Sequence, residues 1–435
     1  MNEPLTPNTQ AVLLLTAPLI AGRSETTRGL LSLGEYNRLA LILRQKLKQP
    51  ADLLAPDAAE LIEVCAQPFG RARLDALLGR GFLLSQAVEQ WSARAIWVIS
   101  RANAKYPRRL KAKLKEDAPP LLYGCGDIAL LEKGGLAVVG SRHVDDELIS
   151  YTENVGRLTA EAHHSIVSGG AKGIDRAAMH GALKAGGDVV GVMADSLEKA
   201  ALDRDNREAL MDSRLVLVSP YDPSAGFNVG HAMQRNKLIY ALADAALVVT
   251  SDFEKGGTWA GAIEQLDRLH FVPVFVRNGA NAGKGNSVLL NRGGKPWPNP
   301  QSGNELGRAL VAAAAAIMAE PRQYTLPLTV QEEPSAYEAV PVAKPAETVT
   351  AKDEPALIDV KLSPEAELLN AVREILRREL AEARTEEEVT ALLCVTKPQA
   401  KAWLARFVEE AVIERVKKSR PARFCTVTKA DRLIW

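Results

Sequence analysis

The chain has 435 residues, 47% of them hydrophobic and 25% charged, with a formal net charge of +1 at pH 7, as in a globular protein of two or three domains. A uniformly basic surface is therefore excluded, and any nucleic-acid surface must be a local patch. The apolar stretch 11–20 is too short to span a membrane, so we expect no signal peptide and no membrane anchor. The cysteines form no CxxC pair, which argues against zinc and disulfides and fits a reducing cytoplasm. They are Cys65, Cys125, Cys394 and Cys425.

The first hundred residues are predicted to be helical. Leucines recur at helical spacing in 35–48 and 57–66, and residues 71–82 form a basic amphipathic segment that reaches glycine turns. Such a helix end can hold a nucleic-acid backbone, but the charged face of a small helical bundle explains it better. We assign residues 1–100 to an N-terminal helical, SAM-like domain.

A strand–helix–strand–helix unit begins at residue 136. Residues 136–139 are an apolar run of strand length that ends at Gly140-Ser141-Arg142, and apolar residues at helical spacing follow. A second buried strand at 165–167 enters a glycine-rich loop over 168–173, and a new helix is predicted from about 174. This order predicts a βαβ unit whose two strands end in small, glycine-rich loops.

The alternation of strands and helices continues after this unit. Regular βα repeats predict an α/β domain over 101–318, with a Rossmann-like, doubly wound parallel sheet. The absence of a complete GxGxxG motif argues against a dinucleotide cofactor. The further strands are predicted at 121–123, 189–194, 215–219, 246–250 and 272–276, with helices at 206–211, 234–243 and 258–269.

Four clusters at predicted strand ends favour phosphate binding. Glycine turns that lead into helix N-termini offer backbone N–H groups to anions, although the same glycines could simply make tight turns. Asp175 is interpreted as an acid that complements a helix dipole rather than as a general base, and His180 as a packed or orienting residue rather than a metal ligand. The clusters are Gly140-Ser141-Arg142, the loop around Lys172, Arg235-Asn236-Lys237 at the start of the 234–243 helix, and Gly256-Gly257-Thr258.

The chain changes character after residue 318. Residues 319–362 are rich in Pro, Glu, Ala, Thr and Val, which predicts a disordered linker. Residues 363–435 match a C-terminal winged-helix domain, with helices at 364–382, 386–393 and 399–411 and a basic wing near residue 420. Three glutamates on the would-be recognition helix favour protein binding over duplex DNA.

Several motifs in the same order resemble the DNA-processing protein A family (DprA/Smf). The resemblance spans roughly residues 100–300 and implies an extended Rossmann fold that binds single-stranded DNA, dimerises through that domain and delivers DNA to the recombinase RecA during natural transformation. The motifs include Tyr106-Pro107, Pro120-Leu121-Leu122-Tyr123, Val138 to Arg142, Val167 to Asp175, His180 to Leu183, Arg235 to Ile239, Gly257-Thr258 and Gly285-Asn286.

The resemblance assigns nucleic-acid-binding roles to individual residues. Arg142 would hold a DNA phosphate, Lys172 would make a second backbone contact, and Lys237 stands where the family usually has an arginine, which keeps the charge but loses a bidentate fork. The tyrosine-proline-x-x-asparagine stretch of the family is largely missing around residues 194–206, so we read the chain as a divergent member. The full set is Gly140, Ser141, Arg142, Ser168, Gly169, Gly170, Lys172, Gly173, Asp175, Arg235, Asn236, Lys237, Gly257 and Thr258.

These features predict a non-catalytic, cytoplasmic single-stranded DNA-binding protein that uses no cofactor and no metal. It would act as a homodimer, with a RecA-type recombinase or the product of a neighbouring gene as partner, in transformation, recombination or phage defence. Phe227, Tyr240 and Trp259 are the nearest stacking candidates, although the last two could be core residues. The alternative is a nucleotide-binding enzyme or sensor, because Gly257-Thr258 and Glu264 resemble the pattern of nucleoside-monophosphate phosphoribohydrolases.

Overall fold

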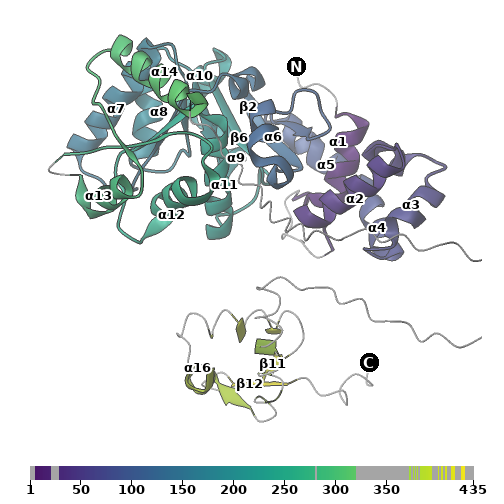
Figure 1. Ribbon diagram of the computed structural model, residues 1–435. Coiled ribbons are helices and arrows are strands. Elements are labelled where there is room, and N and C mark those ends of the chain that lie inside the picture. The colour runs from purple at the N-terminus through teal and green to yellow at the C-terminus, as the bar shows by residue number, and fades with distance from the viewer. Residues whose placement is uncertain are drawn as a thin grey trace, which may run out of the picture. The chain divides into compact units, whose positions relative to one another are not determined.

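The computed structural model describes residues 5–20, 29–279 and 282–319, with scattered residues between 372 and 426. The chain divides into two compact units, Met1–Leu328 and Thr329–Trp435 (Figure 1). The predicted linker 319–362 lies outside the described residues apart from its first position. The predicted domain borders at 100, 318 and 362 stay predictions.

Helices form the start of the first unit, as predicted. The guanidinium of Arg80 donates to the carbonyls of Leu13, Leu14 and Ala17 at the end of the first helix, where the Leu13 carbonyl also accepts the Ala17 N–H. The prediction that helix extends through residue 100 is wrong, because the β-branched and aromatic run Trp97–Ser100 forms strand β1. The helices are α1 Pro7–Thr16, α2 Leu33–Gln45, η1 Pro50–Leu54, α3 Ala59–Ala66, α4 Arg71–Leu78 and α5 Gly81–Ser92.

Nine strands form one mixed sheet in the order β1-β2-β6-β5-β4-β3-β7-β8-β9. Seven neighbouring strands, in the spatial order β6-β5-β4-β3-β7-β8-β9, are parallel, as predicted for a doubly wound sheet. Strands β1 and β2 add an antiparallel pair at one edge. The chain starts the parallel part at β3, moves outward through β4, β5 and β6, and then returns to the other side of β3 as β7. The remaining bounds are β2 Leu121–Gly126, β3 Leu136–Val139, β4 Ile166–Ser168, β5 Val189–Val192, β6 Leu215–Ser219, β7 Ala245–Val248, β8 Val274–Val276 and β9 Lys295–Pro296.

Both faces of the sheet are buried under helices. Because successive side chains of a strand point to opposite faces, alternate residues enter two different cores. Leu136 and Val138 enter the core under α7, α8 and α14, whereas Ala137 and Val139 enter the core under α6, α11 and α12 (Figure 1). These helices span α6 Arg108–Leu114, α7 Asp146–Glu161, α8 Ile174–Lys184, α11 Val229–Leu242, α12 Gly256–Glu264 and α14 Gly303–Ala319. The connections contain η2 Lys115–Asp117, η3 Ile128–Glu132, α9 Leu197–Leu202, α10 Arg204–Met211, the π-helical turn η4 Gln265–Leu269 and α13 Gly283–Asn291.

The second unit is described only in part. Helix α16, Glu386–Leu393, begins with a reciprocal cap in which the Thr385 side chain accepts from the Glu388 N–H and Glu388 accepts from the Thr385 N–H. Strands β10 (Arg384–Thr385), β11 (Ile413–Arg415) and β12 (Arg423–Thr426) form a small antiparallel sheet. Most of the predicted helices and the basic wing lie outside the described residues, so the winged-helix assignment stays a prediction.

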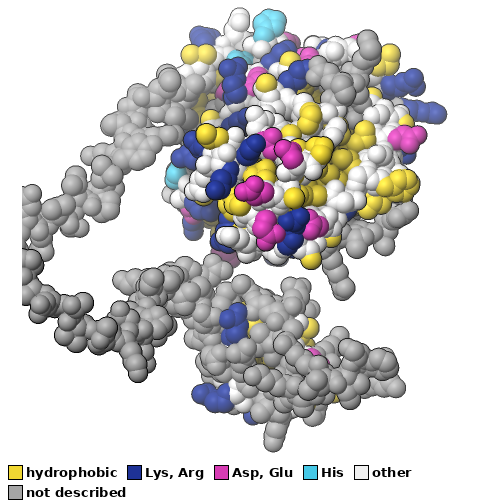
Figure 2. All heavy atoms as spheres, turned by 90° about the vertical axis from the view of Figure 1, so that its right-hand side faces the viewer, with side chains coloured by type: hydrophobic (Ala, Val, Ile, Leu, Met, Phe, Trp, Pro, Cys, Tyr) yellow, Lys and Arg dark blue, Asp and Glu magenta, His cyan; other side chains and the backbone are white. Residues whose placement is uncertain are grey.

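The N-terminal helices carry charges of both signs. On the face shown in Figure 2, hydrophobic side chains lie among basic and acidic ones. Arg71 pairs with Glu63 and Asp75, and Arg73 pairs with Glu35. The charged-face reading of residues 71–82 therefore fits these two arginines better than a nucleic-acid contact does. Across the part of the chain that is described, no helix combines the length and the apolar character that a membrane span needs.

Candidate nucleic-acid interface

A pocket of about 630 Å³ lies where the strand order reverses, between the carboxyl ends of β3 and β7. In open α/β sheets this switch point leaves a crevice, because the connections of the two adjacent strands leave in opposite directions. The segment after β3 supplies Val139 to His143, and the segment after β7 supplies Asp252 and Glu254 to Ala260. The start of α11 forms a third wall.

Asp175, in the first turn of α8, fastens the loops that border this pocket. Its carboxylate accepts the Gly169 N–H at 3.2 Å, and the backbone N–H groups of Ala171 and Gly140 also act on its pKa. Burial raises the pKa of Asp175 to about 6, although Arg235 and these three N–H groups act to lower it. The Gly169 N–H is thus occupied by the protein's own carboxylate. Asp175 lies in the first turn of α8, as the dipole reading predicted, and the phosphate-binding role of these loops stays a prediction.

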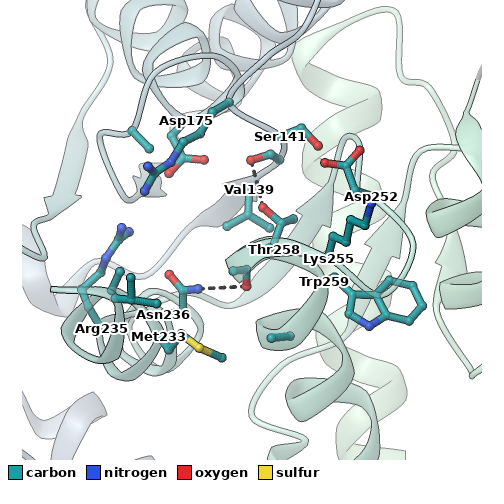
Figure 3. A pocket seen from close by; sticks show the side chains of 18 of the residues that line it. Val139, Ser141, Asp175, Met233, Arg235, Asn236, Asp252, Lys255, Thr258 and Trp259 are labelled. Carbon is teal, nitrogen blue, oxygen red and sulfur yellow. Dashed lines mark hydrogen bonds between the residues drawn. The ribbon is translucent and has the colours of Figure 1, made fainter. Parts of the chain in front are cut away.

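Arg235, on α11, lies against the loop after β4. Its side chain is only 5% exposed, and a Cβ atom built on Gly169 would come within 1.6 Å of its Nη1 atom. Neither Nε nor Nη1 has a hydrogen-bond partner among the residues that the structure describes. Burial lowers the pKa of this guanidinium, while Asp175 raises it. Figure 3 shows Arg235 and Asp175 on the same side of the pocket.

The opposite side of the pocket is the N-terminus of α12. Its capping residue, Lys255, makes no side-chain cap, and Gly256 adopts φ +79°, a conformation that glycine reaches without steric cost. The Thr258 hydroxyl donates to the Gly140 carbonyl at 2.9 Å, and the Asn236 amide donates to the Gly257 carbonyl at 3.1 Å (Figure 3). These bonds tie α12 to β3 and to α11, so the uncapped N–H groups of α12 are held at the pocket.

Exposed apolar side chains lie at the mouth of the pocket. Phe227, Val229 and Met233 are 58%, 65% and 45% exposed, and the Arg142 guanidinium lies over the Phe227 ring at 5.6 Å. Trp259 is half-buried and packs edge-to-face on Phe253. An apolar surface beside cations can accept the faces of unpaired bases.

The tyrosine among the three predicted stacking candidates belongs to the core. Tyr240 is 2% exposed, although it contributes to the pocket lining. Its core reading is therefore confirmed, and Phe227 is the most exposed aromatic of the pocket.

The charges of the pocket are mixed. Arg142, Arg235 and Lys255 line it together with Asp175, Asp252 and Glu254. In Figure 3, Asp252 and Lys255 lie on the side opposite Arg235, with Thr258 between the two sides. Arg142 and Arg235 therefore place two positive charges at one side of the pocket, where the Asp175 carboxylate offsets part of the charge of Arg235.

The structure brings eight of the predicted residues into one pocket and leaves six outside it. Ser168 is buried and donates to the Val138 carbonyl at 2.6 Å, which joins β4 to β3, and Gly169 is buried beneath Arg235. Gly170 and Gly173 border a second cavity of about 570 Å³, and Lys172 is exposed on the loop between them. The eight are Gly140, Ser141, Arg142, Asp175, Arg235, Asn236, Gly257 and Thr258.

Lys237, the sixth residue outside the pocket, is engaged elsewhere. Its Nζ atom lies 3.4 Å from Glu264 Oε1, and its side chain is 15% exposed. The prediction that residues 235–237 start a helix is also wrong. Helix α11 begins at Val229, where the Asn228 side chain accepts the His231 N–H, so the 235–237 segment has no free backbone donors of a first turn.

Sequence reasoning found Phe227 but missed Val229, Met233 and Lys255. Val229 and Met233 are four residues apart, so they share one face of α11, but the true start of that helix is needed to recognise the pair. His180 Nδ1 lies 3.0 Å from Glu153 Oε1 and the His180 side chain is 60% exposed, so its packed or orienting role stays a prediction. Within the described residues, no group of three His, Cys, Asp or Glu could hold a metal ion.

The part of the chain that resembles known proteins coincides with the nine-stranded sheet. The profile of the family described as DNA recombination-mediator protein A matches residues 97–302. DNA processing protein DprA of Bacillus subtilis (strain 168) is 29% identical over 192 residues, which cover 42% of this chain and 62% of the relative. DNA processing protein DprA of Streptococcus pneumoniae (strain ATCC BAA-255 / R6) is 32% identical over 171 residues, which cover 38% of this chain and 60% of the relative. The chain thus spans about three fifths of the length of these relatives.

A solved structure shows the same fold. The X-ray structure of DNA processing protein A from Streptococcus pneumoniae superposes on 70% of this chain and 98% of that chain, with a TM-score of 0.52 and 21% sequence identity. The pocket therefore lies in a fold that this chain shares with a DNA-processing protein.

Proposed function

Because residues 97–302 belong to the DNA recombination-mediator protein A family, we propose that this domain binds single-stranded DNA and catalyses no reaction on it. The observation that carries the proposal is the pocket at the β3–β7 switch point, where Arg142 and Arg235 stand beside the exposed apolar rim. The arginines would contact phosphates, and Phe227 with Met233 would contact base faces. Base faces are free only in an unpaired strand, which favours single strands over duplex.

The grip on the backbone would come from a few cations. Arg142, Lys172, Arg235 and Lys255 are the basic residues at or beside the pocket. Four phosphate contacts on a single strand give a salt slope of about −3, so a rise from 50 to 200 mM salt would weaken binding by ~50-fold. None of these groups is placed to read base edges, so we expect tolerance of any sequence.

The wider role follows from the family and belongs to the same proposal. A homodimer formed through the α/β domain would raise the avidity for a long strand, which it would protect and pass to a recombinase or use in another DNA transaction such as phage defence. We place this activity in the cytoplasm, in keeping with the buried free thiols of Cys65 and Cys125. The phosphoribohydrolase-like alternative finds no support in the geometry, because Glu264 pairs with Lys237 and Arg268 and does not line the pocket.

The test is a binding titration of a fluorescent oligonucleotide, single-stranded or duplex, over a salt series. Arg142→Ala and Lys172→Ala should each weaken single-strand binding and each reduce the salt slope by about 0.7. Lys184→Ala is the matched control, because Lys184 is an exposed cation at the opposite end of α8. Absence of binding at low salt, or identical slopes in all three variants, would overturn the proposal.

A further inference from the structure

Unlike the exposed cations Arg142 and Lys172, the guanidinium of Arg235 is buried, and two of its nitrogen atoms lack hydrogen-bond acceptors within the described residues. Arg142 and Lys172 are exposed to water, which solvates their charges. Arg235 is more than nine-tenths buried, lines the pocket, and has two nitrogen atoms without a hydrogen-bond partner among the described residues. Buried N–H groups without an acceptor are costly, and an anion inside the pocket would accept their hydrogen bonds.

The surroundings of Arg235 limit which anion can reach it. Asp175 is the carboxylate on this side of the pocket; it accepts the Gly169 N–H and offsets part of the charge of Arg235, but it makes no hydrogen bond to the Nε or Nη1 atom of Arg235. Asp252 and Glu254 lie on the segment after β7, and Figure 3 shows Asp252 on the side of the pocket opposite Arg235. A phosphate at Arg235 therefore lies away from Asp252, with Asp175 as the carboxylate on its own side of the pocket.

The shape of the site distinguishes two kinds of phosphate. An internal phosphodiester carries a sugar on each side, so both flanking nucleotides must enter the pocket before the phosphate reaches a buried group. A terminal phosphate has a single substituent and can enter first, with its nucleoside behind it. The pocket volume of about 630 Å³ lies in the range of pockets that enclose one small ligand.

We propose that this pocket binds the terminal phosphate of a nucleotide, with the phosphate on Arg235 and the nucleoside directed toward the apolar rim. The uncapped N-terminus of α12 faces the same space and adds backbone donors. A terminal phosphate monoester carries nearly two negative charges near pH 7, which suits a buried guanidinium better than the single charge of a diester. The ligand is the phosphorylated end of a single strand or a free nucleoside monophosphate. The first of these rests on the proposed function.

The experiment compares twelve-residue oligothymidylates that differ only at their ends. Strands with a 5′-phosphate, with a 3′-phosphate, or with two hydroxyl ends are titrated against the full-length protein at fixed salt, and thymidine monophosphate is tested by thermal shift and as a competitor. We expect one phosphorylated strand to bind at least ten-fold more tightly than the hydroxyl strand. Arg235→Lys should reduce this preference to within two-fold, because an ammonium lacks the planar fork.

A control variant tests whether the preference for a phosphorylated end depends on Arg235, inside the pocket, and not on Arg142 at its mouth. Arg142→Ala should weaken all three strands by the same factor and retain the preference, since Arg142 is exposed beside Phe227. Equal affinities of the three wild-type strands, without binding of thymidine monophosphate, would overturn this inference and leave the proposed function intact. Loss of all strand binding with retained binding of the monophosphate would overturn the proposed function and support the inference. The wild-type comparison decides even if Arg235→Lys fails to fold.

Discussion

Gly169→Ala probes the contact on which the site depends. The backbone of Gly169 is outside the left-handed region, so alanine can adopt its conformation and the effect is purely steric. The added Cβ would lie 1.6 Å from Arg235 Nη1 and 2.7 Å from Asp175 Oδ2, where ordinary contacts begin near 3.4 Å. The guanidinium must therefore move by roughly 2 Å, or the loop after β4 must leave Asp175.

The expected loss of stability has two parts. Overpacking of a buried site costs about 1–3 kcal/mol, and weakening of the 3.2 Å bond from the Gly169 N–H to Asp175 costs about 1 kcal/mol. We expect the free energy of unfolding in urea to fall by about 2–4 kcal/mol. We also expect the preference for a phosphorylated end to disappear, because Arg235 is displaced.

Gly34→Ala is the matched control. Gly34 lies in the first turn of α2, is exposed, and has no atom within 4 Å of an added Cβ. Alanine there should leave the free energy of unfolding unchanged or raise it by up to ~1 kcal/mol. If Gly169→Ala proves as stable as Gly34→Ala, Arg235 does not pack against Gly169, and the reasoning about the buried guanidinium fails.

Three further predictions follow from single side chains. Phe227→Ala should weaken single-strand binding by about 1 kcal/mol in anisotropy titrations. It should change the free energy of unfolding by less than ~0.5 kcal/mol, because the ring is 58% exposed, and an unchanged affinity would show that Phe227 is not part of the interface. Hydrogen bonding from Arg73 lowers the pKa of Glu35 from 4.5 to about 2, so the ionised carboxylate stabilises the fold above pH 4.5 and this stabilisation is lost as the pH falls toward 2. In urea titrations at pH 6 and pH 3, Glu35→Gln should therefore remove about 1 kcal/mol of the pH dependence of the free energy of unfolding, a small value because the pair is partly exposed. Burial raises the pKa of Asp175 from 3.8 to about 6, so the protein is more stable with this carboxyl protonated, below pH 3.8, and loses that stability as the pH rises through 6. Asp175→Asn should remove a change on the order of 2–3 kcal/mol in the free energy of unfolding between pH 4 and 7. An unaltered pH profile would show that this carboxyl is not buried.

The parallel sheet was predictable because its strands are short apolar runs with abrupt glycine ends. Residues 136–139 and 215–219 were placed at the bounds that the structure shows, and the two glycine-rich loops do follow adjacent strands. Strand β1 was missed because four residues directly after a helix give too short a pattern to separate strand from helix. Its partner β2 was found from its apolar run, but its antiparallel direction depends on a tertiary pairing.

The chemistry of the candidate site was less predictable, because it depends on which polar groups meet in space. Sequence motifs placed Arg235 and Lys237 in the same cluster, yet they lie two positions apart on a helix and face different neighbours. One is buried against Gly169 and the other pairs with Glu264. Likewise, nothing in the sequence shows that the Asp175 carboxylate accepts the Gly169 N–H.

That carboxylate explains why a glycine-rich loop here need not be the anion site itself. Asp175 accepts the Gly169 N–H and so holds the loop after β4 in the position that Arg235 needs. The donors left at the pocket are then a buried guanidinium on one side and the uncapped start of α12 on the other. An anion at this site would be held by groups that are fixed before it arrives, so little side-chain entropy is lost on binding. The exposed cations Arg142 and Lys172 lack such support, which is why we assign them the salt-dependent grip on the strand and assign Arg235 the discrimination of its end.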